Sequence, residues 1–250
     1  MAKKFIYDSA GTYNATLTDG TVSGTAFTAT SSITNELYAQ DQNISNAITS
    51  YNTDDGIRFD FTTAQSIDTV ALYFTGASSG TLNIYPEGAN DVTLGTSLGN
   101  DSSLGAGWNI LDITETSKAN WFLVATVAEV TNLSEVILGK TLTFPFNPNL
   151  NSKESKQFGV DVVESYGGNE YANKRHDGKR MWEISFSNLT ETDKTNFESM
   201  RDAISTNFLK FLYYDDSSYH WVRALSGSFE FTEVAYQAYN MNVKMIEQLA

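Results

Sequence analysis

Few residues of this chain could carry out catalysis, and they lie far apart in the sequence. The chain has two histidines, His176 and His220, and it has no cysteine. The lack of cysteine excludes disulfides, thiolate metal sites and cysteine nucleophiles. A metal-binding or triad role for either histidine would require partners that only the fold can bring close. We therefore expect both to be surface or hydrogen-bonded side chains.

Paired carboxylates are the other candidates for catalysis, because glycosidases use two carboxyl groups about 5–10 Å apart. Asp54–Asp55 and Asp215–Asp216 lie in turn sequences, where aspartate bonds to the backbone. Glu191 and Asp193 suit the start of a helix. The chain also contains no P-loop, dinucleotide-binding glycine motif, nucleophile elbow or zinc-protease motif. We expect no enzymatic activity and no catalytic residue.

Binding residues are better represented than catalytic ones. The aromatic side chains of Tyr51 and Trp108 are candidates for stacking on a sugar, whereas Trp121 lies in a strand and is expected in the core. The one basic concentration surrounds Asp177–Gly178, which resembles a hairpin turn. It is either a solvated hairpin tip or a contact with an acidic surface of a neighbouring subunit; its candidate interface residues are Lys174, Arg175, Lys179 and Arg180.

The composition indicates a globular protein with two parts. The chain has 250 residues, of which 41% are hydrophobic, and a net charge of −14. Residues 1–140 hold 5 bases and 15 acids (5 − 15 = −10), and residues 141–250 hold 11 bases and 15 acids (11 − 15 = −4). An acidic surface repels phosphate, so we expect no specific nucleic-acid binding. We also expect neither a signal peptide nor a membrane-spanning segment, because no apolar run is long enough.

Residues 1–140 have the pattern of short antiparallel strands. Gly56 is expected to take a positive φ in the turn after Asn52. Clear strand patterns follow the turn, and Gly139 is expected to end the last of them. Such strands with no helix between them indicate a β-sandwich or jelly roll. The expected strands are Ile57–Phe61, 67–75, 81–85, 108–113, 121–127 and 134–138.

The order of these strands resembles the galactose-binding-like (discoidin-type) jelly roll over roughly residues 40–140. The resemblance rests on the Ile-x-Phe-x-Phe strand, the Gly-Trp entry and the final Ser-Glu-Val-Ile-Leu-Gly. It implies sugar binding by loops at one end and, in many members, a Ca²⁺ site. Glu135 falls where the family has an acidic residue in its last strand. The family's Asp-Gly partner motif is missing, because Ala47 is followed by Ile48 and Thr49.

Residues 141–154 are expected to form a linker, since Pro145 and Pro148 fix φ and disfavour a helix. The domain assignment is therefore 1–140 for the jelly roll and 155–250 for a second β-domain. In the second domain, strand patterns surround one helix at about 190–206, with Thr190 as N-cap. Its apolar stripe consists of Phe197, Met200, Ile204 and Phe208, and Asn207 is a plausible helix end.

Residues 155–250 resemble the tail-tube-like domain of phage minor tail and distal tail proteins. The resemblance rests on Tyr-Gly-Gly-Asn, Arg-Met-Trp-Glu-Ile-Ser-Phe, Ser-Asn-Leu-Thr before the helix, and the final Asn-Val-Lys-Met-Ile-Glu. It implies a non-enzymatic virion protein, assembled in the host cytoplasm, that forms a homo-oligomeric ring at the junction of tube and tip. Its partners would be tube, hub or tip proteins, and the jelly roll would face outward.

An alternative function is that of a carbohydrate-binding adhesin that recognises host-surface glycans through the jelly roll. A third alternative, an accessory module of a secreted glycosidase, lacks a signal peptide to support it. No cofactor is expected, apart from the Ca²⁺ that the jelly-roll resemblance implies at Glu135.

Overall fold

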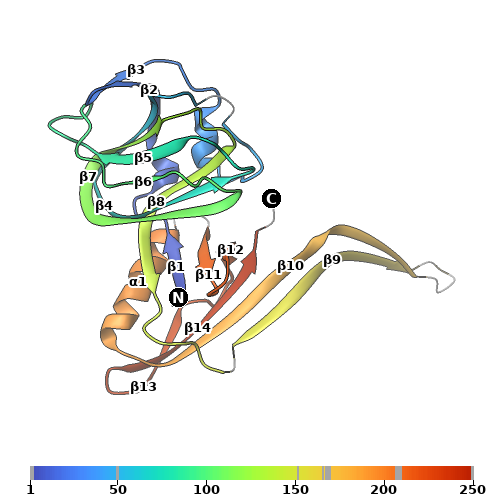
Figure 1. The fold of residues 1–250 in the computed structure, drawn as a ribbon. Helices are drawn as coiled ribbons and strands as arrows, with labels where there is room; N and C mark the ends of the chain where they lie inside the picture. The colour runs from blue at the N-terminus through green and yellow to red at the C-terminus, as the bar shows by residue number, and fades with distance from the viewer. Residues whose placement is uncertain are drawn as a thin grey trace. The chain divides into compact units, whose positions relative to one another are not determined.

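The computed structural model describes residues 3–48, 51–150, 152–164, 166, 170–205 and 210–248, without the side chain of His176. The chain divides into two compact units (Figure 1). Unit 1 comprises residues 3–5 and 143–248, and unit 2 comprises residues 6–142. The sequence predicted a domain boundary at residue 140, close to residue 143, where the chain returns to unit 1. It assigned the first five residues to the jelly roll, whereas residues 3–5 belong to unit 1.

Unit 2 is a mainly β unit with two short 3₁₀ helices, at Thr12–Asn14 and Glu36–Gln40. Its main antiparallel sheet has the strand order β6-β5-β7-β4-β8, and β2 pairs with both β3 and the first half of β4. This arrangement is consistent with the predicted β-sandwich jelly roll. The strands are β2 (Thr16–Ser23), β3 (Ala26–Ala29), β4 (Asp55–Phe74), β5 (Thr81–Pro86), β6 (Gly99–Asp101), β7 (Gly107–Thr126) and β8 (Leu133–Thr143).

The long strands β4 and β7 organise the core of unit 2. Each joins two strands that the sequence predicted separately, and their pairing shifts register between Asp60 and Gln65. Within this stretch Thr62, Thr63 and Ala64 are exposed, so the core does not require a regular ladder at these three residues. Side chains from both halves of β4, such as Phe59 and Phe74, enter one hydrophobic core. The predicted alternation of Ile57 and Phe59 inward is confirmed.

Two predictions about glycines in unit 2 are wrong. Gly139 does not end its strand, because β8 continues to Thr143. A Cβ at Gly139 would lie 1.9 Å from the carbonyl oxygen of Tyr7, so glycine here permits the close approach of β1 (Lys4–Tyr7). Gly56 lies at the start of β4, and the left-handed turn conformation belongs instead to Asp54, with φ 67°.

Unit 1 contains an antiparallel sheet and one helix within the described residues. The sheet order is β11-β12-β14-β10-β9, and β13 pairs with β14. The helix α1 (Glu191–Ser205) confirms the predicted range. The strands are β9 (Lys153–Glu164), β10 (Glu170–Leu189), β11 (Lys210–Tyr214), β12 (Tyr219–Ala224), β13 (Glu230–Ala235) and β14 (Ala238–Glu247).

The start and the inner face of α1 are those that the sequence predicted. The amide of Asp193 donates to Thr190 Oγ1, and the amide and hydroxyl of Thr190 donate to Asp193 Oδ2, which is a reciprocal cap. Phe197, Met200 and Ile204 are buried. The predicted helix end at Asn207, and Phe208 of the same stripe, lie outside the described residues.

An aromatic cluster fills the core of unit 1, and Phe5 lies inside it. The Phe5 ring lies 4.7 Å from that of Phe144 and 5.0 Å from that of Phe211, as centroid distances. Phe144, which the sequence placed in the linker, also packs edge-on against Phe186. Residues far apart in the sequence thus share one core, and the segment after β8 is part of it.

Candidate functional site

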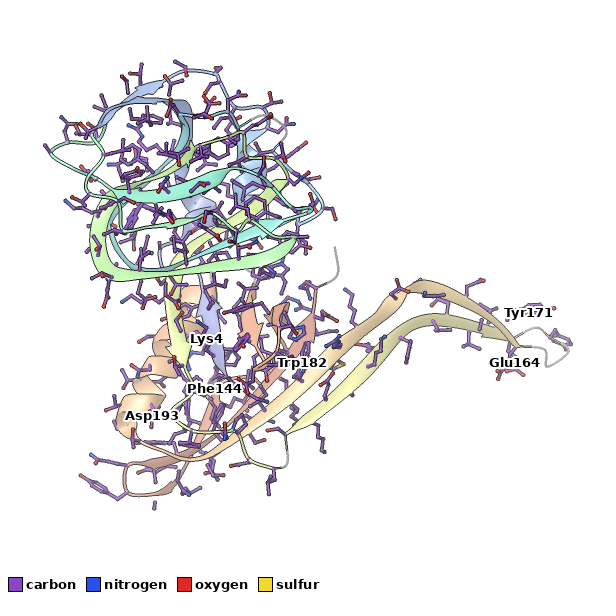
Figure 2. The ribbon with its side chains drawn as sticks, viewed as in Figure 1. Lys4, Phe144, Glu164, Tyr171, Trp182 and Asp193 are labelled. Carbon is purple, nitrogen blue, oxygen red and sulfur yellow. The ribbon has the colours of Figure 1, made fainter. Side chains whose placement is uncertain are left out.

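The most distinctive feature of unit 1 is a two-stranded arm. β14 pairs with β10 only from Met181 to Leu189. From Glu170 to Arg180, β10 pairs with β9 alone. We call this part of β9 and β10 the arm. In Figure 2, Trp182 lies at its base, whereas Glu164 and Tyr171 lie at its far end.

One face of the arm carries an exposed apolar stripe. Side chains alternate along β9, so Phe158, Val160 and Val162 point to the same face. They are 64%, 47% and 59% exposed, respectively. Glu154, four residues before Phe158, is paired with Trp182, which is buried at the arm's base. The stripe therefore lies on the same side of the sheet as the core of unit 1. Along the arm, however, no core side chains among the described residues cover this side.

The opposite face and the tip of the arm are also apolar in part. Val163 is directly opposite Tyr171, and each is 60% exposed. Tyr166 at the tip is fully exposed. Contiguous exposed apolar side chains on a soluble protein mark a surface that another molecule covers.

The four predicted interface residues lie on this arm, but they do not form a hairpin turn. Lys174, Arg175, Lys179 and Arg180 lie within β10, and the turn prediction at Asp177–Gly178 is wrong. The pairing with β9 instead shifts register twice, between Lys174 and His176 and between His176 and Lys179. Each shift places one extra residue in β10, which is a β-bulge, so the Asp-Gly sequence bends a strand rather than reversing it.

Part of this basic charge is neutralised within the arm. Lys174 forms an ion pair with Asp177, and Arg175 forms one with Asp161. Both pairs are at the surface, where such interactions contribute little to stability. Lys179 and Arg180 lie closer to the base of the arm, paired with Gln157 and Lys156.

His220 is a buried, hydrogen-bonded histidine, which is one of the two environments expected for it. Its Nε2 lies 2.8 Å from Asp215 Oδ2 and 3.1 Å from Ser218 Oγ. Its Nδ1 lies 3.7 Å from Glu247 Oε1, too far for the hydrogen bond that would orient a catalytic base. The cluster closes the turn between β11 and β12.

Asp215 supports this turn, as the sequence predicted. Its Oδ1 accepts hydrogen bonds from the amides of Ser217 and Ser218. Burial raises the pKa of Asp215, but the hydrogen bonds from Ser217, Ser218 and His220 outweigh burial and hold the pKa below its ordinary value.

The two glycan-contact candidates have different environments. Tyr51 is completely buried, and its hydroxyl donates to the carbonyl oxygen of Leu123. A ring with no exposed surface cannot stack on a sugar, so this prediction fails for Tyr51. Trp108 is half-buried and packs edge-on against Tyr73, with ring centroids 5.1 Å apart. Trp121 is in the core, as expected.

Glu135, the calcium candidate, is buried in β8 directly opposite Tyr73. The pKa of Tyr13 is raised by burial and by the nearby Glu135 and Asp8 carboxyls. No group of three or more His, Cys, Asp or Glu side chains within the described residues could hold a metal ion. Backbone carbonyl oxygens also bind calcium, so the calcium site at Glu135 stays a prediction.

The sequence placed the basic residues correctly on one structure but missed the arm itself. The sequence does predict a strand at Phe158–Glu164, and β9 confirms it. That the apolar face of this strand is uncovered is seen only in the fold. No helix in the described ranges is long and apolar enough to cross a bilayer.

Neither a family model nor a curated protein matches this sequence. The solved structures that are similar to about half of the chain include several carbohydrate-binding modules. Chitosan-binding module 1 of a chitosanase/glucanase from Paenibacillus sp. IK-5 is 14% identical, with a TM-score of 0.38, and the match covers 54% of this chain and 99% of the module.

Two further modules match to a similar extent. The family 32 module of C. perfringens NanJ, solved with galactose, is 10% identical, with a TM-score of 0.37 and coverage of 55% of this chain and 99% of the module. The family 32 module of AlyQ, solved with 4,5-unsaturated mannuronic acid, is 16% identical, with a TM-score of 0.38 and coverage of 53% and 96%. Similarity at this level does not assign a ligand to this chain.

Proposed function

We propose that this protein is a structural component of a phage tail that assembles with copies of itself through the arm. The observation that carries the proposal is the exposed apolar surface of the arm, above all Phe158, Val160 and Val162. An isolated two-stranded hairpin is at best marginally stable in water. An arm of this length with apolar side chains on it is therefore expected to be covered by another protein surface.

The assignment to a phage tail rests on the resemblance of residues 155–250 to tail-tube-like domains. In this proposal the protein is a distal tail or minor tail component that forms a ring at the junction of tube and tip. It is assembled in the host cytoplasm and carried in the virion. The net charge of −14 would keep DNA from adhering to such a ring.

An arm-shortened variant tests the role of the arm. Residues 157–179 are replaced by Asn-Gly, a two-residue hairpin turn that joins Lys156 to Arg180, which are already paired. We expect the full chain to assemble into rings, seen by light scattering and electron microscopy. The variant should form no rings of that size but should still unfold cooperatively in urea. Val127→Asp is the matched control, since Val127 is 82% exposed on unit 2.

A full chain that stays monomeric at every concentration and never associates with tail particles would contradict the proposal. Assembly of the arm-shortened variant to the same size as the full chain would show that copies meet through another surface.

A second candidate function is carbohydrate binding by unit 2, as in a host-recognising adhesin. The observation that favours it is the half-buried Trp108 ring beside Tyr73, since partly exposed aromatic rings are a common platform for sugars. A glycan array with the full chain tests this function. Sugar-specific binding that Trp108→Ala abolishes supports it, whereas an array without any bound glycan contradicts it.

A further inference from the structure

β9 is a free edge of the sheet in unit 1. It is the last strand in the sheet order, and in the described part of the chain it pairs only with β10. The backbone N–H and C=O groups along its outer side can therefore pair with another strand. Edge strands of soluble proteins are normally short or protected, but β9 runs from Lys153 to Glu164.

The side chains on the apolar face of β9 are in a self-complementary order. From one end to the other they are Lys156, Phe158, Val160, Val162 and Glu164. If a second β9 lies antiparallel beside the first, with the two-fold axis at Val160, each lysine is opposite a glutamate. Each Phe158 is then opposite a Val162, and the two Val160 side chains face each other. All opposed positions have even numbers, so they lie on the same face of the joined sheet.

We propose that β9 pairs with β9 of a second copy of this chain about this two-fold axis. The proposal rests on the proposed function, in which the arm joins copies, and it names the surface that covers the arm. The two hairpins become one four-stranded sheet of order β10-β9-β9-β10, with Phe158, Val160 and Val162 of both copies at its centre (Figure 2 shows one arm). Three or more strands with an apolar face have the independent stability that two lack.

The charges of a single arm support a second copy as the occupant. Within one arm, Lys156 is directly opposite Arg180, and Glu164 is directly opposite Glu170. Like charges in directly opposed positions destabilise a sheet. In the proposed pair of copies, Glu164 of the second copy lies beside Lys156 of the first. Across the four strands the order is then Arg180 and Lys156 of one copy, followed by Glu164 and Glu170 of the other. The second copy thus offsets both unfavourable pairs of the isolated arm.

A two-fold contact closes with two copies, because both copies use the same surface. A ring needs a head-to-tail contact in addition, and β13, which pairs only with β14 among the described strands, is a second free edge. Because the contact between arms does not depend on a ring, we expect it to form in the purified protein and to join copies in pairs.

Cysteine cross-linking tests the axis directly, since the chain has no cysteine of its own. Directly opposed Cα atoms in an antiparallel pair are about 4.5–5.5 Å apart, within the range that a disulfide spans. Val160→Cys should therefore give a covalent dimer on mild oxidation. Val162→Cys is the matched control: its symmetry mate is displaced by four residues, about 13 Å along the strand. It should cross-link only with Phe158→Cys chains.

Charge exchange within one chain is a second, independent test. Lys156→Glu and Glu164→Lys should each weaken dimerisation about tenfold, because each places two like-charge pairs across the axis. The double variant Lys156→Glu/Glu164→Lys restores opposite charges at both places and should dimerise more tightly than either single variant. A docking site elsewhere on the partner would not be restored by this exchange.

The outcomes separate this inference from the proposed function. The two-fold contact is overturned if the unchanged chain forms rings but the Val160→Cys chain forms no disulfide-linked dimer. It is also overturned if the double charge variant dimerises as weakly as the single variants. In both cases the proposed structural role of the protein still stands. A cross-linked dimer, together with recovery of dimerisation in the double charge variant, supports the two-fold contact. If the unchanged chain forms such dimers but never a ring, the ring in the proposed function is contradicted.

Discussion

Phe5 provides the sharpest test of how the chain divides into units. It precedes the whole jelly roll in sequence, yet it is fully buried in the aromatic core of unit 1. Replacing it with alanine removes ring contacts with Phe144 and Phe211 and leaves a cavity among bulky side chains. Such a Phe→Ala change costs about 3–5 kcal/mol. With a urea dependence of about 2 kcal/mol per molar, the unfolding midpoint of unit 1 should fall by roughly 2 M.

The four tryptophans allow the two units to be followed separately, because two lie in each. Unit 1 contains Trp182 and Trp221, and unit 2 contains Trp108 and Trp121. Replacing one pair with phenylalanine leaves fluorescence from the other unit only. We expect Phe5→Ala to lower the urea midpoint reported by the pair in unit 1.

The matched control for this prediction is Phe74→Ala, which removes an equally buried phenylalanine from the core of unit 2. It should lower the midpoint reported by Trp108 and Trp121. If Phe5→Ala lowers only that midpoint, Phe5 stabilises unit 2 and the assignment of residues 3–5 to unit 1 is refuted.

Three further changes test local features of each unit. Gly139→Ala should destabilise unit 2 by several kcal/mol, measured by urea unfolding, because its Cβ would overlap the Tyr7 carbonyl. Thr190→Ala should cost about 1 kcal/mol through loss of the reciprocal cap with Asp193, measured by thermal unfolding. Asp215 has a folded pKa below its ordinary value of 3.8, so it stabilises the protein above that pH and loses this effect as the pH falls through the folded pKa. Asp215→Asn should flatten the loss of stability below pH 4, measured by unfolding at a series of pH values.

Each of these changes has a control nearby. Gly105→Ala adds a methyl group with no neighbour closer than 3.9 Å and should be tolerated. Ser199→Ala removes an exposed hydroxyl from the same helix as the cap and should have little effect. Asp216→Asn removes the same charge next to Asp215 and should keep the acid dependence. Equal effects of a change and its control would contradict the overlap at Gly139, the cap at Thr190 or the role of Asp215, respectively.

The helix and most strands could be predicted from the sequence because their signals are local. Thr190 and Asp193 cap the helix within one turn, and the Phe197–Ile204 stripe follows the helical period. The alternation at Ile57 and Phe59 likewise predicts a half-buried strand without any knowledge of its neighbours.

The errors have a common physical cause, since a turn sequence is a preference that strand pairing can override. Asp177–Gly178 has the sequence of a tight turn, but β9 pairs along both sides of it, so the chain forms bulges there. Gly139 has the local sequence of a strand end, whereas its role is to admit the backbone at Tyr7, a residue far away in sequence.

The sequence alone determined the fold class, the helix, the lack of thiol chemistry and the concentration of basic charge in residues 174–180. Only the tertiary structure decided which of these belong together. It placed Phe5 with Phe144 and buried Tyr51, because packing depends on contacts between distant segments that no local pattern records. It also showed that β9 has no second neighbour among the described strands. The exposed stripe centred on Val160 therefore lies on an edge strand that can pair with another chain.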